Sequence, residues 1–346
     1  MKAFGFLEHG GIDKALVWEA PEPPAPGPGE VRLSIIAAAF NRLDLFTLQG
    51  LEGVEVPRPH ILCGDASGIV EEVGEGVPGL RKGDRVLVNP GLSDGTCAAC
   101  RAGREMLCRH YRILGEHLQG LACERAVVPA RNLLPLPDNL DPVEAAGVPL
   151  VFMTAWRALR DVGELRAGER VAIIGAGGGL STAAIQIAAE AGGRVLVASR
   201  SREKAERTRT LGAQDVLEIR PDVPLSQALW EASGKEGFPL IFDCTGKETF
   251  PSSARALARG GRLVFCGATT GPRVEIDLRP LFWRNASLRG STMGSREDLR
   301  QALDRLARGR LRPVVDSVHP LEQGARGLLR LQSGEVFGKV ILRVSG

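Results

Sequence analysis

The segment that most constrains the fold runs from Arg170 to Lys204, with the sequence RVAIIGAGGGLSTAAIQIAAEAGGRVLVASRSREK. Its first apolar run, Arg170–Gly175, predicts a strand buried on both faces of a parallel sheet. A glycine-rich turn follows, and Leu180–Ala191 predicts a helix whose alanines let it lie close on the sheet. Arg194–Ala198 predicts a second strand. We therefore expect a βαβ unit in which the start of the helix offers free N–H groups to a pyrophosphate.

The glycine turn matches a dinucleotide-binding loop only in part. The usual G-x-G-x-x-G positions hold Ala176, Gly178 and Ser181, and the frame Gly175-x-x-Gly178-x-x-Ser181 also fits. Such a turn is a weak signal alone, because it could simply close a structural βαβ unit. Its place between a strand and a helix favours cofactor binding. The residues we assign to that loop are Gly175, Gly178, Gly179, Leu180 and Ser181.

The end of the second strand carries information about which cofactor binds. An NAD site usually places Asp or Glu there to hold the ribose hydroxyls. This chain instead has Ser199, Arg200, Ser201 and Arg202, followed by Lys204. Hydroxyl and guanidinium groups bind a 2′-phosphate that an acid would repel. The alternative, that a serine caps the next helix and the arginines are solvated, is compatible with this. We predict NADP(H) because the acid is absent.

Composition limits the classes of protein to consider. The 346 residues suffice for two domains, and 44% apolar with 25% charged residues is ordinary for a soluble globular protein. A net charge of +3 without a basic, aromatic-rich run gives no indication of a nucleic-acid or membrane partner. The N-terminal sequence MKAFGFLEHGG lacks the apolar core of a signal peptide, so we expect a cytoplasmic protein. Its seven cysteines are then expected as thiols and not as disulfides.

The chain changes character near its middle. Up to residue 135, short predicted strands alternate with Gly- and Pro-rich turns, which indicates a barrel-like β domain. A helical section begins at Pro142–Leu159, and strands then alternate with helices to about residue 293, which predicts a parallel sheet. Later expected strands are Leu240–Cys244, Arg262–Cys266, Ser287–Gly290 and Lys339–Val344, and later expected helices are Arg296–Ala307 and Gln323–Leu331.

These pieces, in this order, resemble the medium-chain dehydrogenase/reductase family over nearly the whole chain. The combination is specific although each part is loose. The markers are GDASGIVEEVGEGV at 64–77, GDRVLV at 83–88, a cysteine-containing lobe, the loop at 175–181 and GKVIL at 338–342.

The resemblance implies an α/β fold with two domains. A GroES-like β-barrel catalytic domain would comprise residues 1–150 and 294–346, around a Rossmann-type, doubly wound parallel-sheet nucleotide domain at 151–293. The family places its active site in the cleft between them. It also implies a homodimer or homotetramer formed through edge strands near Ala286–Gly290.

The cysteine lobe matches the family's four-ligand structural zinc loop. Its spacing is Asp94-x-x-Cys97-x-x-Cys100-x7-Cys108, with Asp94 where a cysteine is usual. Zinc accepts carboxylate oxygen as well as thiolate in a tetrahedral site. A decayed lobe with free thiols is the alternative. We predict a structural Zn²⁺ because three thiolates and a competent acid remain.

The catalytic zinc of the family's alcohol dehydrogenases lacks its ligands here. Two cysteines and a histidine would be expected, and those positions hold Asn41, Gly64 and Leu150. Asp65 survives in the place of a nearby acid. Zinc needs about three good protein ligands to polarise an alkoxide, so we expect no catalytic zinc of the usual type.

The sequence Asn41-x-x-Asp44 instead resembles the family's zinc-free branch, the quinone-oxidoreductase-like and enoyl-reductase-like members. In them hydride passes to a conjugated acceptor, and polar groups or water supply the proton. Asn41 could bind a substrate carbonyl or be a turn residue at a strand end. Asp44 could orient that loop or cap the next segment.

A further polar cluster, Tyr111, Glu116 and His117, lies beside the family's substrate-lining position. Glu116 and His117 could donate a proton or, with Asp44 or Asp65, bind a metal in an unusual way. A Glu-His pair in a turn is, however, more often found at the surface.

Further cofactor contacts rest on the resemblance alone. Arg42 and Lys339 match positions that contact the pyrophosphate, and Thr154 matches one that packs on the nicotinamide. Plain sheet packing is the alternative for the small residues. The positions that match strand ends beside the nicotinamide ribose and carboxamide are Thr245, Ala268, Thr292 and Met293.

The sequence thus predicts an NADP(H)-dependent oxidoreductase that reduces a small conjugated carbonyl, enone or quinone. A zinc-dependent alcohol dehydrogenase with non-standard catalytic ligands is one alternative. An NADPH-binding sensor or structural protein without turnover is another. The predicted catalytic residues are Asn41, Asp44, Asp65 and His117.

Overall fold

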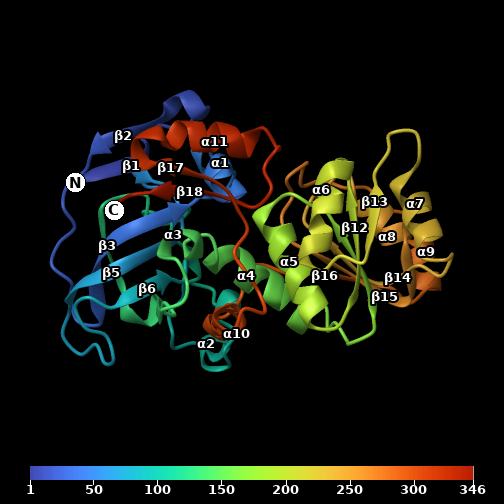
Figure 1. The fold of residues 1–346 in the computed structure, drawn as a ribbon, viewed down its shortest axis with the longest axis horizontal. Helices are drawn as coiled ribbons and strands as arrows, with labels where there is room; N and C mark the ends of the chain where they lie inside the picture. The colour runs from blue at the N-terminus through green and yellow to red at the C-terminus, as the bar shows by residue number, and fades with distance from the viewer. Residues whose placement is uncertain (346) are drawn as a thin grey trace. The chain divides into compact units, whose positions relative to one another are not determined.

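The structure is a computed structural model that describes residues 1–345. Contacts divide the chain into two compact units, one made of Met1–Val151 and Gly294–Gly346, the other of Phe152–Met293. Both ends of the chain lie in the first unit (Figure 1). That unit is therefore assembled from two segments that are far apart in the sequence.

The first unit is built on mostly antiparallel β structure of the GroES-like kind, in which β17 and β18 are a parallel pair. Its main sheet has the order β10-β6-β5-β3-β18-β17, and β9 also pairs with β3. Smaller sheets have the orders β2-β1-β4 and β7-β8. The strands are β1 (Lys2–Phe6), β2 (Ala15–Glu19), β3 (Glu30–Ala39), β4 (His60–Ile61), β5 (Asp65–Val73), β6 (Arg85–Val88), β7 (Gly91–Leu92), β8 (Arg112–Ile113), β9 (Arg125–Pro129), β10 (Leu133–Pro135), β17 (Val315–Pro320) and β18 (Lys339–Arg343).

Helices accompany this β structure, and α4 (Pro149–Trp156) begins in the first unit and ends in the second. A short π-helical turn, Arg157–Val162, continues α4 in the second unit. The helices are α1 (Arg42–Gln49), α2 (Ala98–Arg101), α3 (Pro142–Ala145), α4 (Pro149–Trp156), α10 (Arg296–Ala307) and α11 (Gly324–Gln332), with 3-10 turns at Ile12–Lys14, Glu105–Leu107, Ala130–Asn132 and Leu321–Gln323.

Strand β3 is central to the first unit because one of its faces is buried along its whole length. Val31, Leu33 and Ile35 are fully buried, and the residues between them are partly exposed, as the two-residue period of a strand requires. The last three residues, Ala37–Ala39, are all buried. The carboxyl end of β3 therefore enters the core between its antiparallel neighbours β5 and β18.

The second unit is a six-stranded parallel sheet with the order β13-β12-β11-β14-β15-β16. This order, reversing at β11, is that of a Rossmann-type doubly wound fold, and the predicted fold class is confirmed. Its elements are β11 (Arg170–Ile174), α5 (Gly179–Glu190), β12 (Arg194–Ser199), α6 (Arg202–Arg207), a 3-10 turn (Thr208–Leu211), β13 (Asp215–Glu218), α7 (Leu225–Ala232), β14 (Phe238–Asp243), α8 (Phe250–Arg255), β15 (Leu257–Phe265), α9 (Arg279–Trp283) and β16 (Ser287–Gly290).

Two segments differ from the sequence expectation. Strand β15 begins at Leu257 and not at Arg262, because the pairing with β14 starts early and then shifts register before Arg262. Gly260 lies in that irregular part with a positive φ of 68°, a conformation that favours glycine. The segment after Asn41, expected as a loop, forms helix α1.

No helix within residues 1–345 is both long enough and apolar enough to cross a membrane.

Candidate functional site

The amino-terminal end of α1 fixes the position of Asn41. Asn41 is the N-cap residue, and the carboxylate of Asp44, three residues on, accepts a hydrogen bond from the Asn41 backbone N–H at 2.7 Å. The other Asp44 oxygen accepts from the backbone N–H of Cys63, also at 2.7 Å. Asp44 therefore both caps the helix and ties it to the chain before β5. Burial raises the pKa of the Asp44 carboxyl to about 6, against the effect of these hydrogen bonds.

Sheet pairing brings Asn41 next to Asp65 and Lys339. Ala39, the last residue of β3, is paired with Asp65, the first of β5, and with Ile341 of β18. Lys339 is the first residue of β18. Because β5 and β18 run antiparallel to β3, their beginnings meet at the edge where β3 ends. Asn41 comes two residues after that end.

The three side chains form a closed hydrogen-bonded network. The Lys339 ammonium donates to the Asn41 carbonyl oxygen at 2.6 Å and to Asp65 Oδ2 at 3.0 Å. The Asn41 amide nitrogen donates to the same Asp65 oxygen at 2.8 Å, and the backbone N–H of Leu150 donates to Asp65 Oδ1 at 2.8 Å. These partners fix the orientation of the Asn41 amide. Its oxygen must face the Lys339 ammonium, which can only donate, and its nitrogen must face the Asp65 carboxylate, which can only accept.

This network lies almost wholly out of solvent. The exposed fraction is 8% for Asn41, 0% for Asp65 and 5% for Lys339. A buried charge must be paired, and Asp65 and Lys339 pair with each other. Asn41 and Asp65 were expected at the reacting centre, whereas Lys339 was expected at the cofactor pyrophosphate and is bonded to both of them.

The positions that would hold a catalytic zinc do not fit one. At Gly64 a side chain has no room, because a Cβ there would lie 2.5 Å from the carbonyl oxygen of Leu114. The Asn41 oxygen is taken by a cation, and Leu150 contributes a backbone N–H, which cannot bind a metal. The residues present therefore offer no open three-ligand site.

Glu116 and His117 lie in the turn after β8, close to the same network. Gly115 packs on the peptide between Cys63 and Gly64, and Asp44 holds the N–H of Cys63. Glu116 is only 9% exposed. Burial, and next the negative charge of Asp44, raise the pKa of the Glu116 carboxyl to about 7. The expectation that this pair is typical of the surface is thus wrong for Glu116.

His117 is held as a neutral imidazole. Its Nδ1 accepts a hydrogen bond from the backbone N–H of Ile113 at 3.3 Å and lies 3.7 Å from a Glu116 oxygen. Because Nδ1 accepts the N–H of Ile113, it carries no proton, and the single proton of the neutral ring is on Nε2. Burial, with the charge of Arg112, lowers the pKa of His117. The unusual metal site considered for these residues with Asp44 or Asp65 does not form within residues 1–345, where one candidate ligand group, the cysteine lobe, is found.

The glycine loop of the second unit fits a pyrophosphate. Gly175 follows β11 with a φ of 105°, which favours glycine, and Gly178 is the N-cap of the twelve-residue helix α5. A Cβ at Gly178 would meet nothing within 4 Å, so the space before the helix is open. Gly179 and Leu180 begin the helix, and Ser181 is buried with its Oγ 3.7 Å from Cys244 Sγ. The first N–H groups of α5 are thus available to an anion.

Residues assigned to the nicotinamide end follow the strands of this sheet. Thr245 follows β14, Ala268 follows β15, and Thr292 with Met293 follow β16. In a parallel sheet these carboxyl ends share one edge, the edge at which Gly175 follows β11. In α4, the hydroxyl of Thr154 is buried and makes no hydrogen bond with a described residue. In the first unit, Arg42 is the first residue of α1.

No acid stands at the end of β12. Ser199 Oγ accepts a hydrogen bond from the Ser201 N–H at 3.2 Å, and Ser201 caps α6 by accepting from the Lys204 N–H at 3.3 Å. The capping alternative is therefore confirmed for Ser201. The Arg200 side chain is 77% exposed and makes one ion pair with Glu248 at 3.3 Å, so a ligand can reach its guanidinium.

The four residues of the cysteine lobe come together as predicted. The ligand atoms of Asp94, Cys97, Cys100 and Cys108 all lie within 4.8 Å of one another, and the sulfurs of Cys97 and Cys100 are 3.5 Å apart. Tetrahedral zinc with Zn–S bonds of about 2.3 Å spaces its ligands by about 3.8 Å, so a small contraction suffices. All the cysteines are free thiols. The donor set fits a structural zinc.

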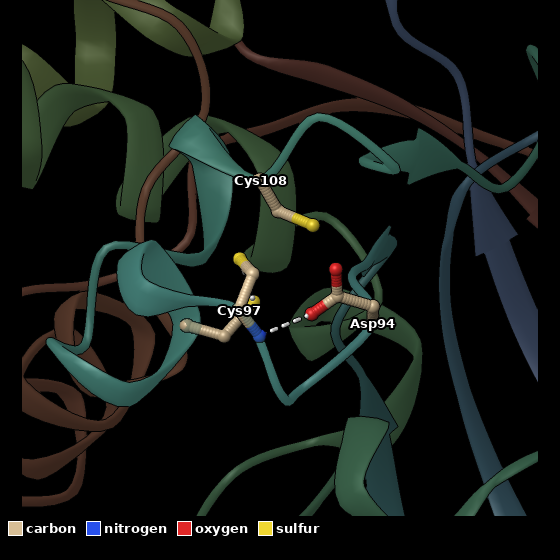
Figure 2. Close-up of side chains that lie close together, drawn as sticks. Asp94, Cys97 and Cys108 are labelled. Atoms are coloured by element: carbon tan, nitrogen blue, oxygen red, sulfur yellow. Dashed lines mark hydrogen bonds between the residues drawn. The ribbon is translucent and has the colours of Figure 1, made fainter.

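Hydrogen bonds orient Asp94 for this role. One carboxylate oxygen accepts from the backbone N–H groups of Thr96 and Cys97, both at 2.8 Å. Figure 2 shows that bond to Cys97, with the other oxygen on the side of the Cys108 sulfur. That second oxygen is 3.2 Å from His110 Nδ1. The two N–H bonds hold the pKa of the Asp94 carboxyl far below its usual range, so it is an anionic donor.

For the cysteine lobe we expect one zinc per chain, which the double change Cys97→Ser, Cys100→Ser removes, because it deletes two of four donors. Elemental analysis of metal-washed protein measures this. The change Asp94→Cys is the matched control, since it completes a four-thiolate set and should keep the metal. A second zinc that survives the double change would contradict the absence of a catalytic zinc site.

The chain matches two family models. Residues 27–138 match the alcohol dehydrogenase GroES-like domain, and residues 179–308 match the zinc-binding dehydrogenase domain. It is 33% identical to an alcohol dehydrogenase of Geobacillus stearothermophilus, over 96% of each chain. It is also 33% identical to an acryloyl-coenzyme A reductase of Metallosphaera sedula, over 93% of this chain and 94% of the relative. A crystal structure described as an NAD-dependent alcohol dehydrogenase covers the whole chain at 41% identity, with a TM-score of 0.94.

Proposed function

This chain belongs to the medium-chain dehydrogenase/reductase family of oxidoreductases, and we propose that it is an NADP(H)-dependent reductase of a small conjugated carbonyl, enone or quinone. One observation carries the proposal. The buried amide of Asn41, which is bonded to Lys339 and Asp65, stands at one of the three positions where the family's alcohol dehydrogenases would have a zinc ligand. The other two positions hold Gly64 and Leu150. Chemistry at this centre then relies on hydrogen bonding and not on a Lewis-acid metal.

Asn41 is the substrate-orienting residue in this proposal. Its oxygen and one N–H are held by Lys339 and Asp65, so the second N–H of the amide has a fixed direction. That N–H binds the carbonyl oxygen of the acceptor. Asp44 keeps Asn41 in place through the N-cap of α1. The bound nicotinamide supplies the hydride that reduces the β-carbon.

Glu116 supplies the proton that completes the reduction. It is nearly buried, and the pKa of its carboxyl, about 7, keeps a large protonated fraction at neutral pH. His117, predicted as catalytic from the sequence, uses Nδ1 as an acceptor from the backbone, and we assign it to supporting the turn.

The two kinds of relative lead to different expectations. The acryloyl-coenzyme A reductase acts, by its name, on a conjugated thioester, which supports a conjugated carbonyl substrate here. The alcohol dehydrogenases support the alternative of alcohol oxidation with non-standard zinc ligands. A cofactor-binding protein without turnover is the third candidate.

We further propose a cytoplasmic homodimer or homotetramer that carries a structural zinc. The free thiols support a reducing compartment. In the second unit, Phe282 and Trp283 of α9 are 63% and 71% exposed, and β16 is the edge strand of the sheet. An exposed aromatic pair and an unpaired strand edge are features that a second subunit would cover.

With zinc only in the cysteine lobe, the protein should oxidise NADPH in the presence of α,β-unsaturated ketones, thioesters or quinones, and should not oxidise primary alcohols with NADP⁺. Nicotinamide absorbance measures both. Alcohol oxidation that depends on a second zinc would replace this proposal with the alcohol dehydrogenase alternative. Tight NADPH binding without turnover of any of these ketones, thioesters, quinones or alcohols would favour the alternative of an NADPH-binding sensor or structural protein.

The change Ser199→Asp tests the cofactor. A carboxylate can accept the same Ser201 N–H, so the turn is kept, but it repels a 2′-phosphate. We expect the KM for NADPH to rise about tenfold or more while the KM for NADH does not rise. Ser199→Ala is the control that removes the hydroxyl without adding charge. A wild-type preference for NADH would contradict the NADP(H) assignment.

The change Glu116→Gln tests the proton donor. For the wild type, kcat of the reduction should fall as pH rises through about 7, since only the protonated acid donates. Glu116→Gln should lower kcat about 100-fold and remove the fall of kcat above pH 7. His117→Gln should keep that fall. If the fall is lost in His117→Gln and persists in Glu116→Gln, the proton donor is His117 instead.

A further inference from the structure

The fold brings an acid to the end of β12 that the strand end itself does not supply. The carboxylate of Glu248 lies 3.3 Å from Nη1 of Arg200, although 48 positions separate the two residues in the chain. The prediction of NADP(H) was based on the absence of Asp or Glu at the end of this strand. Glu248 places a negative charge beside the arginine that is expected to bind the 2′-phosphate, so it affects the choice of cofactor.

The pair of Arg200 and Glu248 lies at the edge of the sheet where a nucleotide is expected. Arg200 follows β12, Glu248 lies in the segment after β14, and β11 lies between these two strands. Neighbouring strands are about 4.8 Å apart, so the pair joins segments whose strands are about 10 Å apart. Doubly wound sheets bind nucleotides outside the carboxyl ends of the strands, where the strand order reverses, which is here at β11. The pair therefore spans the carboxyl end of the strand that leads into the glycine loop.

Hydrogen bonds within the protein hold the backbone of Glu248 in this position. Its N–H donates to Thr270 Oγ1 at 3.0 Å, and the N–H of Thr270 donates to the carbonyl oxygen of Thr245 at 2.9 Å. The buried carboxylate of Asp243 accepts from the Thr245 N–H and from Thr249 Oγ1, both at 2.9 Å. These bonds fix the segment on both sides of Glu248, so the position of the acid does not depend on a bound cofactor.

The ion pair is weak enough for a ligand to compete with it. The side chains of Arg200 and Glu248 are 77% and 55% exposed, and the bond between them is long, at 3.3 Å. An exposed pair of this kind shifts an equilibrium by up to about fivefold. A 2′-phosphate carries about two negative charges and can accept two parallel N–H bonds from a guanidinium, so it is the stronger partner. It also repels a carboxylate that remains nearby.

Resting on the proposed function, we propose that Glu248 is a specificity-determining residue of the cofactor site, whose carboxylate competes with the 2′-phosphate of NADP(H) for the guanidinium of Arg200. NAD(H) has a hydroxyl at this position and leaves the ion pair intact. NADP(H) must displace Glu248 or accept its repulsion, and so loses part of the affinity that Arg200 provides. The protein therefore prefers NADP(H) by a smaller factor than Arg200 alone would give, and Glu248 sets that factor.

Two single variants separate a local effect from a general effect of charge. Glu248→Gln keeps the length of the side chain and removes its charge at an exposed position, so the fold is not at risk. Glu236→Gln is the matched control. Glu236 is 80% exposed and lies 3.9 Å from Arg170, the first residue of β11, at the opposite edge of the sheet. Both changes take one negative charge away from an arginine, but only the first does so at the carboxyl edge.

The measurement is the Kd for NADPH and for NADH, from the nicotinamide fluorescence of the bound cofactor at one ionic strength. Glu248→Gln should lower the Kd for NADPH about three- to tenfold and leave the Kd for NADH within about twofold of the wild type. Glu236→Gln should leave both unchanged. In an Arg200→Gln background, the further change Glu248→Gln should alter the Kd for NADPH by less than about twofold, because no guanidinium is left to compete for.

Other results would overturn either the inference or the function on which it rests. An unchanged Kd for NADPH in Glu248→Gln, or an equal fall in Glu236→Gln, would exclude a local competition. A rise in the Kd for NADPH would make Glu248 a support that orients Arg200, and a rise confined to NADH would make it a ligand of the ribose hydroxyls. If the wild type binds NADH more tightly than NADPH, the NADP(H) assignment is wrong, whereas a lower Kd for NADPH in Glu248→Gln would still support the competition.

Discussion

The buried ion pair between Lys339 and Asp65 is the interaction on which the arrangement of the proposed reacting centre depends. Lys339 and Asp65 lie 3.0 Å apart where the end of β3 meets the beginnings of β5 and β18. Two charges away from water must satisfy each other, and here they also fix the amide of Asn41 through both its oxygen and its nitrogen. Antiparallel pairing delivers all three side chains to one edge of the sheet. The centre is therefore rigid before any substrate arrives.

In the first unit, the candidate zinc site and the proposed reacting centre are formed by different residues. The cysteine lobe brings an oriented acid and three thiols together around a closed site, which suits a structural zinc. At the reacting centre, the carbonyl of Leu114 occupies the space that a side chain at position 64 would need. The three zinc-ligand positions hold Asn41, Gly64 and Leu150, and the Asn41 amide is bonded to Lys339 and Asp65. In the proposed function, the family fold thus hosts a centre based on hydrogen bonds.

Local signals explain which elements could be predicted. Helix α10 has the bounds expected, because Ser295 and Asp298 form a capping box that marks its start. Five of the six parallel strands were visible as short apolar runs, although β13 and the irregular start of β15 were not. Helix α1 was missed, although Asn41-x-x-Asp44 is itself a capping pattern. That pattern was interpreted as part of a reacting centre, and the structure shows that it also begins a helix.

The sequence by itself determined the glycine loop before α5 and the zinc-binding spacing, because each is encoded by residues close together in the chain. It determined the family fold through the order in which several such local motifs follow one another. Only the tertiary structure decided the reacting centre. Lys339 is separated by 298 residues from Asn41 and by 274 from Asp65, so no local pattern links them. The raised pKa of Glu116 likewise depends on burial and on the charge of Asp44, which act through space. Proximity and desolvation are properties of the fold, and they turn separate polar residues into a site.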